Sequence, residues 1–229
     1  MATLCRESIL KSMSLPHRWD DAIAQQVLSA EEEVDRMEDA LGTYLVAVSE
    51  KELSQEDNRT VSILLHTIGD FERIGDHAVN LHKAAKEMHD KKINFSEAAQ
   101  KELAVLEHAV QDLLNRAIEA FEGLKAPQAS RAEPLEEVVD ELVREMKNRH
   151  IARLQSGACT IELGFVLQDI LTNYERVADH CSNIAVAVLE LTHGSFETHA
   201  YLNRVRDERD SAFTAQYEKD RRSYGLESV

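Results

Sequence analysis

One charged stretch occurs twice in this chain, and the repetition limits the folds that the chain can adopt. The stretch GDFERIGDHAVN at 69–80 returns as TNYERVADHCSN at 172–183. Upstream, EEEVD at 31–35 matches EEVVD at 136–140 at an offset of 105. Five residues return at one offset of 103: Glu72, Arg73, Asp76, His77 and Asn80 match Glu175, Arg176, Asp179, His180 and Asn183. The pattern predicts a tandem duplication.

The apolar residues of both copies follow a helical period. They recur at three- and four-residue spacing through 3–14, 18–50, 57–89, 96–122, 134–154, 160–192 and 197–222. With only eight Gly, three Pro and no sustained alternation of β-branched residues, a sheet protein is excluded. We therefore predict an all-α fold of six helices in two repeats, followed by a helix that lies on the surface of the bundle. The first helix is shorter than its counterpart at 96–122, so we expect the chain to begin partway into its first repeat.

Charge and cysteine content limit the function. The formal net charge of −16 repels phosphate backbones and anionic membranes, which excludes a nucleic-acid-binding class and favours cations or basic partners. The three cysteines leave one unpaired in any disulfide scheme, which favours a reducing compartment, with the cytosol as the default. No run of eighteen apolar residues and no secretory signal occurs, so we expect a soluble chain.

The duplication places paired carboxylates on four helices. Residues four apart lie one turn apart on the same side of a helix, and like charges so placed repel by roughly a few tenths of a kcal/mol when exposed and by more when desolvated. The same E-x-x-x-D spacing gives four pairs: Glu31 and Asp35, Glu72 and Asp76, Glu136 and Asp140, and Glu175 and Asp179. Four such repulsions predict compensating cations.

Two kinds of cation would serve, and the sequence leaves both open. Arg73 and Arg176 can bridge the carboxylates between helices, which is the usual arrangement for a single charged pair. Alternatively, the pairs of two neighbouring helices can together bind a divalent or trivalent metal ion, one site per repeat. Oxygen ligands favour iron, manganese, magnesium or calcium over zinc.

The sequence contains no catalytic constellation. It lacks a Gly-rich phosphate loop, a nucleophile elbow and the paired Glu-x-x-His motifs of di-iron enzymes, since only Glu190 and His193 have that spacing. His77 and His180 lie about 100° round the helix from Asp76 and Asp179, away from the apolar face, which favours a solvated or supporting role. We predict no catalytic residues and no organic cofactor.

The repeated E-R-x-x-D-H-x-x-N helices, each preceded by an E-x-x-x-D helix, resemble the PhoU family. YLVAVSEKELSQED at 44–57, RHIARLQSGACTIELGF at 149–165, DILTNYERVADHCSNIAV at 169–186 and the terminal QYEKDRRSYGL are most similar to the PhoU-like cytosolic domain of sodium/phosphate cotransporter family proteins. The resemblance implies two tandem three-helix bundles, a role in phosphate uptake without catalysis, and multinuclear metal clusters on the four E-x-x-x-D pairs.

On this basis we predict a first three-helix repeat at 1–95, a second at 96–194, and a C-terminal helix and tail at 195–229. The predicted function is a cytosolic regulatory or sensory domain of a sodium-dependent phosphate transporter, at the inner face of the membrane. Its expected partner is a membrane transporter portion upstream in the same polypeptide. Phosphate, reached through bound metal, and a second copy of the chain are further candidate partners. The alternatives are a free-standing PhoU-type regulator that docks on an ABC transporter and a sensor kinase, a carboxylate-bridged metalloenzyme, and a helical adaptor whose charges form salt bridges.

Overall fold

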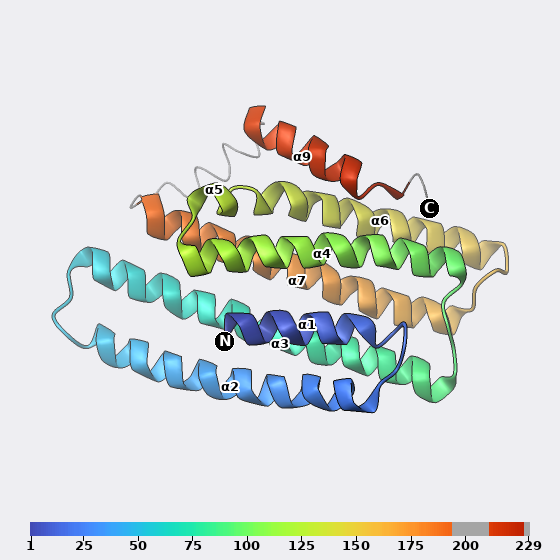
Figure 1. The fold of residues 1–229 in the computed structure, drawn as a ribbon, viewed down its shortest axis with the longest axis horizontal. Coiled ribbons are helices and arrows are strands. Elements are labelled where there is room, and N and C mark those ends of the chain that lie inside the picture. Colours follow the sequence, from blue (N-terminus) through green and yellow to red (C-terminus); the bar gives the residue numbers. More distant parts are fainter. Residues whose placement is uncertain (194–210, 227–229) are drawn as a thin grey trace.

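The computed structural model describes residues 1–193 and 211–226, and it is built from helices (Figure 1). The first repeat comprises α1 (Ala2–Ser14), α2 (Asp21–Ser49) and α3 (Gln55–Lys91). The second comprises α4 (Glu97–Gly123), the single-turn α5 (Ala126–Ala129), α6 (Ala132–Gln155) and α7 (Ile161–His193), and α9 (Ser211–Ser223) follows. The predicted all-α fold is confirmed, while α5 occupies part of the stretch between the fourth and fifth predicted helices.

Short polar residues set where the long helices begin. Asp20 accepts hydrogen bonds from the backbone N–H groups of Ala22 and Ile23 at 2.8 and 3.1 Å, and Ser54 and Ser96 cap α3 and α4 in the same way. These caps satisfy N–H groups that have no partner inside the helix. Each of these three helices therefore starts directly after a cap that is readable in the sequence.

The two repeats pack as three-helix bundles joined through their central helices. The helices α1, α2 and α3 contact one another, as do α4, α6 and α7, and α3 lies against α7 (Figure 1). One apolar core runs through both bundles, with Ile74 of α3 and Val177 of α7 fully buried within it. Burial of this continuous core is the main stabilising contribution, and it confirms the predicted pair of bundles.

The central helices α3 and α7 occupy equivalent environments. Burial along 66–78 matches burial along 169–181 at every position except Gly69, which is half-buried where Thr172 is exposed. The apolar face predicted for α3 is buried, with Phe71 2% exposed and Ala78 fully buried. At Gly75 a Cβ atom would meet Val34 at 3.4 Å, about an ordinary packing distance, and the equivalent residue of α7 is Ala178.

The C-terminal helix α9 is attached to α4 by a buried ion pair and to α6 by a tyrosine hydrogen bond. Asp220, only 2% exposed, accepts two hydrogen bonds of 2.8 Å from the guanidinium of Arg116. Tyr217 donates to Glu141 at 2.6 Å beside this pair. The predicted helix at 197–222 is thus observed from residue 211 onward, and 194–210 lie outside the described residues. Across the described ranges, no helix combines the length and apolar character needed to cross a bilayer.

Candidate functional site

The carboxylates of the first repeat face one another across α2 and α3. Glu31 is half-buried, and burial together with the charges of Asp35 and Asp76 raises its pKa. On α3, burial and the charges of Asp76 and Asp35 raise the pKa of Glu72. Each glutamate is thus affected by a carboxylate of the other helix, as the sequence predicted, and Lys83 and Arg73 only partly offset these effects.

The second repeat gathers its carboxylates across α6 and α7. Burial, followed by the charges of Glu175 and Asp179, raises the pKa of Asp140. Its Oδ1 atom is buried and has no hydrogen-bond partner, an arrangement that is costly unless a cation or water satisfies it. Glu136, one turn earlier on α6, is 7% exposed.

Basic side chains already contact part of this second group. Lys147 of α6 donates to Glu175 at 3.1 Å, and Arg176 donates to Asp179 at 3.1 Å within α7. The interhelical bridge therefore comes from Lys147, whereas the sequence suggested Arg176. In the part of the chain that the structure describes, no three Asp, Glu, His or Cys side chains are arranged to hold a metal ion as they stand.

The donor chemistry nevertheless suits a hard cation in both repeats, because clustered carboxylate oxygens are what such ions bind. Burial, followed by the charges of neighbouring carboxylates, raises the pKa of Glu31, Glu72 and Asp140, although a basic side chain acts on each of them in the opposite direction. Metal binding and salt bridging therefore both stay predictions, the second repeat being the one in which Lys147 and Arg176 would compete with an ion.

The repeated histidines form a reciprocal contact between the bundles. Nδ1 of His77 donates to Oδ1 of Asn173 at 2.8 Å, and Nδ1 of His180 donates to Oδ1 of Asp70 at 2.9 Å. Because Asp70 and Asn173 are equivalent positions, the two contacts are copies related by the duplication. The imidazole rings stack with their centroids 5.6 Å apart.

Of the two roles expected for the histidines, solvated or supporting, the solvated one is wrong: His180 is 14% exposed, at the α3–α7 interface. Burial is the main cause that lowers the pKa of His77. The signal that could have located this interface was the repeat itself, because two equivalent helices of a duplication commonly meet at an axis of pseudo-symmetry. Asp70 and Asn173 occupy equivalent positions of the two repeated stretches, but they are different residues. A comparison that looked for identical residues therefore did not select them.

Two pseudo-symmetric three-helix bundles, joined through their central helices and carrying repeated carboxylate pairs, define a class of duplicated helical-bundle proteins. The PhoU domain model matches residues 1–85 and 103–188, one match for each repeat. The chain belongs to the PhoU family.

Relatives and solved structures agree with this assignment. The Phosphate-specific transport system accessory protein PhoU homolog 1 of Thermotoga maritima is 24% identical, over 85% of this chain and 83% of that protein. The accessory protein PhoU of Escherichia coli is also 24% identical, over 80% of this chain and 76% of that protein. The fold matches the crystal structure of PhoU from Pseudomonas aeruginosa with a TM-score of 0.78 and 22% identity, over 85% of this chain and 92% of that one. It also matches the phosphate transport system regulatory protein PhoU from Streptococcus pneumoniae with a TM-score of 0.73 and 20% identity, over 85% of this chain and 90% of that one.

These relatives correct the predicted partner. They are named as accessory proteins of phosphate-specific transport systems, and this chain aligns with most of their length. The prediction that the partner is a membrane transporter portion of the same polypeptide is therefore wrong. The alternative of an accessory PhoU-type regulator fits the relatives better than the cotransporter domain did.

Proposed function

We propose that this chain is a PhoU-type accessory regulator of phosphate transport, which acts in the cytosol by docking on a transporter and a sensor kinase and has no catalytic activity of its own. The observation that carries the proposal is the match of both repeats to relatives named as accessory proteins of phosphate-specific transport systems. The three free cysteines, two of them buried, suit a reducing compartment.

Deletion of the coding sequence in the source organism tests this function. Uptake of radiolabelled phosphate should then no longer decrease when external phosphate is abundant, and expression of the wild-type chain should restore the decrease. A matched strain expressing Lys86→Met, an exposed substitution on α3, should behave as wild type. Uptake that stays fully regulated in the deletion strain would contradict the proposal.

Within this function we propose that the carboxylate pairs bind metal ions, one group per repeat. Glu31, Asp35, Glu72 and Asp76 would hold the first, and Glu136, Asp140, Glu175 and Asp179 the second. A bound cation would offset the repulsion among neighbouring carboxylates that, after burial, raises the pKa of Glu72 and Asp140. The ion's identity is open among iron, manganese, magnesium and calcium.

Elemental analysis after reconstitution with each of these ions separates metal binding from salt bridging. Glu175→Gln with Asp179→Asn should remove the metal of the second group alone, and Glu72→Gln with Asp76→Asn that of the first, so each double variant is the control for the other. Metal should also raise the melting temperature of the wild type by mass action. Wild-type protein without metal, or unchanged stoichiometry in both variants, would leave only the salt-bridge interpretation.

A further inference from the structure

One cysteine of this chain lies beside a buried histidine. Cys159 belongs to the connection between α6 and α7, residues 156–160, and is partly exposed. Its Sγ atom lies 3.7 Å from Nδ1 of His150, in the last two turns of α6, and 3.5 Å from the backbone carbonyl oxygen of Thr160. Of these two acceptors, the imidazole is the one that can take a proton away from the thiol. A thiol and a base are therefore in direct contact.

The imidazole of His150 is buried with one nitrogen unsatisfied. The residue is only 8% exposed, and Nε2 has no hydrogen-bond partner among the described residues. A Cβ atom at Gly164 of α7 would lie 2.7 Å from Nε2, so the ring occupies space that any other residue at 164 would fill. Burial, followed by the charge of Arg153, lowers the pKa of His150, while Glu102 of α4 acts in the opposite direction. The imidazole is therefore neutral at neutral pH, and its Nδ1 atom can accept a proton.

The first repeat shows that packing does not require this histidine. At the offset of 105, His150 corresponds to Leu45 of α2, and at the offset of 103, Gly164 corresponds to Val61 of α3. Leu45 and Val61 are both buried and belong to one small apolar cluster. The second repeat thus has an imidazole and a glycine where the first packs two apolar side chains. Because a buried nitrogen without a partner costs stability, the substitution favours a chemical role for His150.

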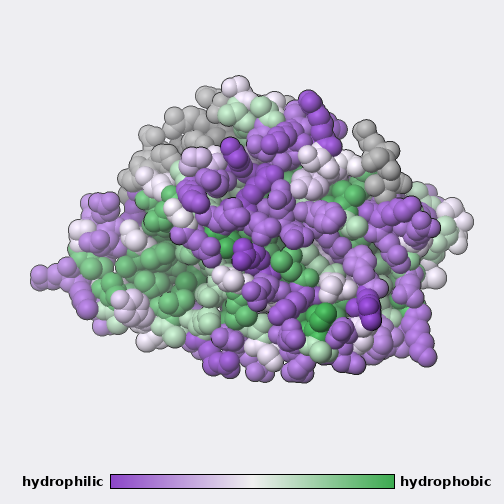
Figure 2. All heavy atoms as spheres, in the orientation of Figure 1, coloured by the Kyte–Doolittle hydropathy of each residue, from purple (hydrophilic) through white to green (hydrophobic). Residues whose placement is uncertain are grey.

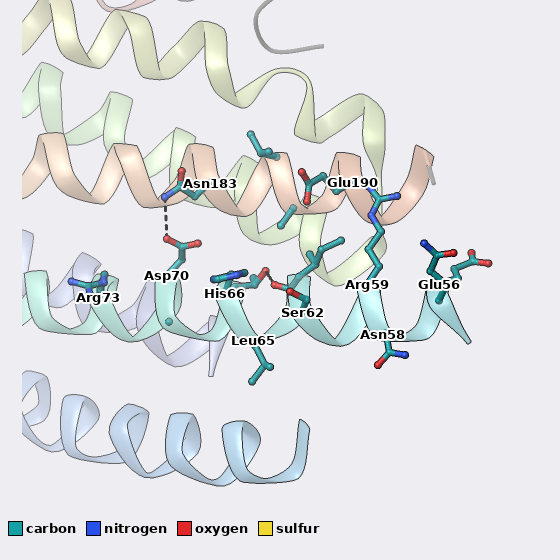
Figure 3. Close-up of a pocket in the computed structure, with 16 residues that line it drawn as sticks. Glu56, Asn58, Arg59, Ser62, Leu65, His66, Asp70, Arg73, Asn183 and Glu190 are labelled. Carbon is teal, nitrogen blue, oxygen red and sulfur yellow. Dashed lines mark hydrogen bonds between the residues drawn. The ribbon is translucent and has the colours of Figure 1, made fainter. Parts of the chain in front are cut away.

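The other two thiols are poorly placed to react. Cys5 and Cys181 are fully buried, and burial is the main cause that raises the pKa of both. A groove of about 1350 Å³ between α3 and α7 opens close to Cys181, where Asn183 donates to Asp70 at 3.1 Å (Figure 3), but Cys181 is not part of its lining. Since the thiolate is the nucleophile in thiol chemistry, Cys159 is the thiol that a reagent in solution can use.

We propose that Cys159 is a site of reversible modification by low-molecular-weight disulfides, with His150 as the base that accepts its proton. The Sγ atom attacks one sulfur of the disulfide, so that a new S–S bond forms to Cys159 while the S–S bond of the reagent breaks. The proton of the thiol passes to Nδ1 of His150 and from there to the departing thiolate. The cysteine is oxidised to a mixed disulfide, and half of the reagent is reduced to a thiol. Thiols of a reducing compartment reverse the exchange.

The rate of reaction with dithiodipyridine, a disulfide whose released thiol absorbs light, tests the proposal on the intact chain. Hydrophilic side chains cover much of the face in Figure 2 and the net charge is −16, so an uncharged reagent is used to avoid charge repulsion. Peptide mass spectrometry should locate one adduct, on Cys159, and dithiothreitol should release it. Cys159→Ser should abolish the fast reaction, because Cys5 and Cys181 are fully buried.

Two variants disable the base in different ways. His150→Leu introduces the residue that the first repeat has at this position, and it should slow the reaction at pH 7 by at least about tenfold. It should not lower the melting temperature, since it also removes a buried nitrogen without a partner. Gly164→Ala keeps both reacting groups but displaces the imidazole, so it should slow the reaction as well. The matched control His108→Leu, at an exposed position of α4, should leave the rate unchanged.

Alkaline pH separates proton transfer from shielding of the thiol. At about pH 10 a thiol with the ordinary pKa of about 8.5 is ionised without a base, so the wild type and His150→Leu should then react at the same rate. Glu102 and Arg153, whose charges act on His150 from α4 and α6, are present in both proteins. Circular dichroism verifies that each protein is folded at both pH values. Equal rates at pH 7 for the wild type and His150→Leu, or a slower rate of His150→Leu that persists at pH 10, would overturn the proposal.

Discussion

The two repeats share their central helices and differ in what surrounds them. In the second repeat, α4 covers the full bundle and α9 is attached by the Arg116–Asp220 pair. The first repeat has only the short α1, and its Leu45, Val61 and Ile68 form a small cluster apart from the main core. The carboxylate helices are thus alike in the two repeats, whereas the described helices that surround them differ.

The repeats also differ in how their charges are compensated. Lys147 reaches Glu175 in the second repeat, whereas in the first repeat the position equivalent to Lys147, at the offset of 105, is Gly42. At the interface, Asp70 of α3 faces His180 while Asn173 of α7 faces His77. The same scaffold thus holds two carboxylate groups and two histidines in different electrostatic surroundings, and substitutions can test whether those differences matter.

The largest expected effect comes from the ion pair found only in the second repeat. Arg116→Met leaves the carboxylate of Asp220 buried without its cation, which should cost about 3 kcal/mol of unfolding free energy. Urea denaturation measures the loss, and hydrogen exchange should show α9 losing protection first. The control Lys86→Met removes an exposed pair whose side chains are 52% and 54% exposed, and should change stability by less than about 0.5 kcal/mol. Equal effects of the two would contradict the assigned role of α9.

The second test compares equivalent positions on α2 and α6. Met146→Ala empties a fully buried site and should cost about 3 kcal/mol. Leu41→Ala removes a side chain that is 39% exposed and should cost less than about 1 kcal/mol. Since Leu and Met have similar helix propensities, the difference mainly reports the burial of the two positions. Similar costs at both positions, measured by urea denaturation, would show that the two positions do not differ in burial.

The third test concerns pH and the histidine that faces an amide. Because the pKa of His77 is lowered in the folded chain, the unfolded chain binds this proton first, and stability should fall as pH drops below about 6.5. Asn173→Asp places a carboxylate against His77, raises its pKa and should reduce that loss by about 1 kcal/mol. Asp76, Arg176 and His180 act on His77 in both proteins.

An NMR titration of the His77 ring, with denaturation at pH 7 and 5.5, measures both quantities. The control Asn58→Asp adds the same charge at an exposed position of α3. If the two variants shift the His77 titration equally, the contact between His77 and Asn173 has no specific effect.

Much of the fold was predictable because it depends on local pattern. The period of apolar residues and the caps Asp20, Ser54 and Ser96 lie within a few residues of the boundaries that they set. The carboxylate groups were predictable as well, since residues four apart must share one side of a helix and the repeat identified which helices are neighbours.

The remaining features depend on contacts between distant segments. Arg116 and Asp220 are 104 residues apart, and neither belongs to a repeated motif. The role of Lys147 was missed because the repeat comparison selected residues common to both copies, whereas its equivalent is Gly42. Long-range ion pairs and departures from the repeat leave no periodic signal in a single sequence.

The smallest expected effect is a difference in stability between equivalent substitutions in the two carboxylate groups. With chelator present at pH 7, Glu72→Gln should stabilise the chain by about 0.5 kcal/mol, because it removes repulsion with Asp76 one turn away. Glu175→Gln should not, since it also removes the partner of Lys147. The raised pKa of Glu72 determines how this difference in stability changes with pH, because the folded chain binds the proton of Glu72 more tightly than the unfolded chain does. The wild type therefore gains stability as the pH falls, and the stability advantage of Glu72→Gln becomes smaller. Thermal melts at pH 7 and 5 measure the difference, with the exposed Glu97→Gln as control. A destabilised Glu72→Gln under chelation would mean that Glu72 already has a compensating partner, and the first repeat would then need no cation.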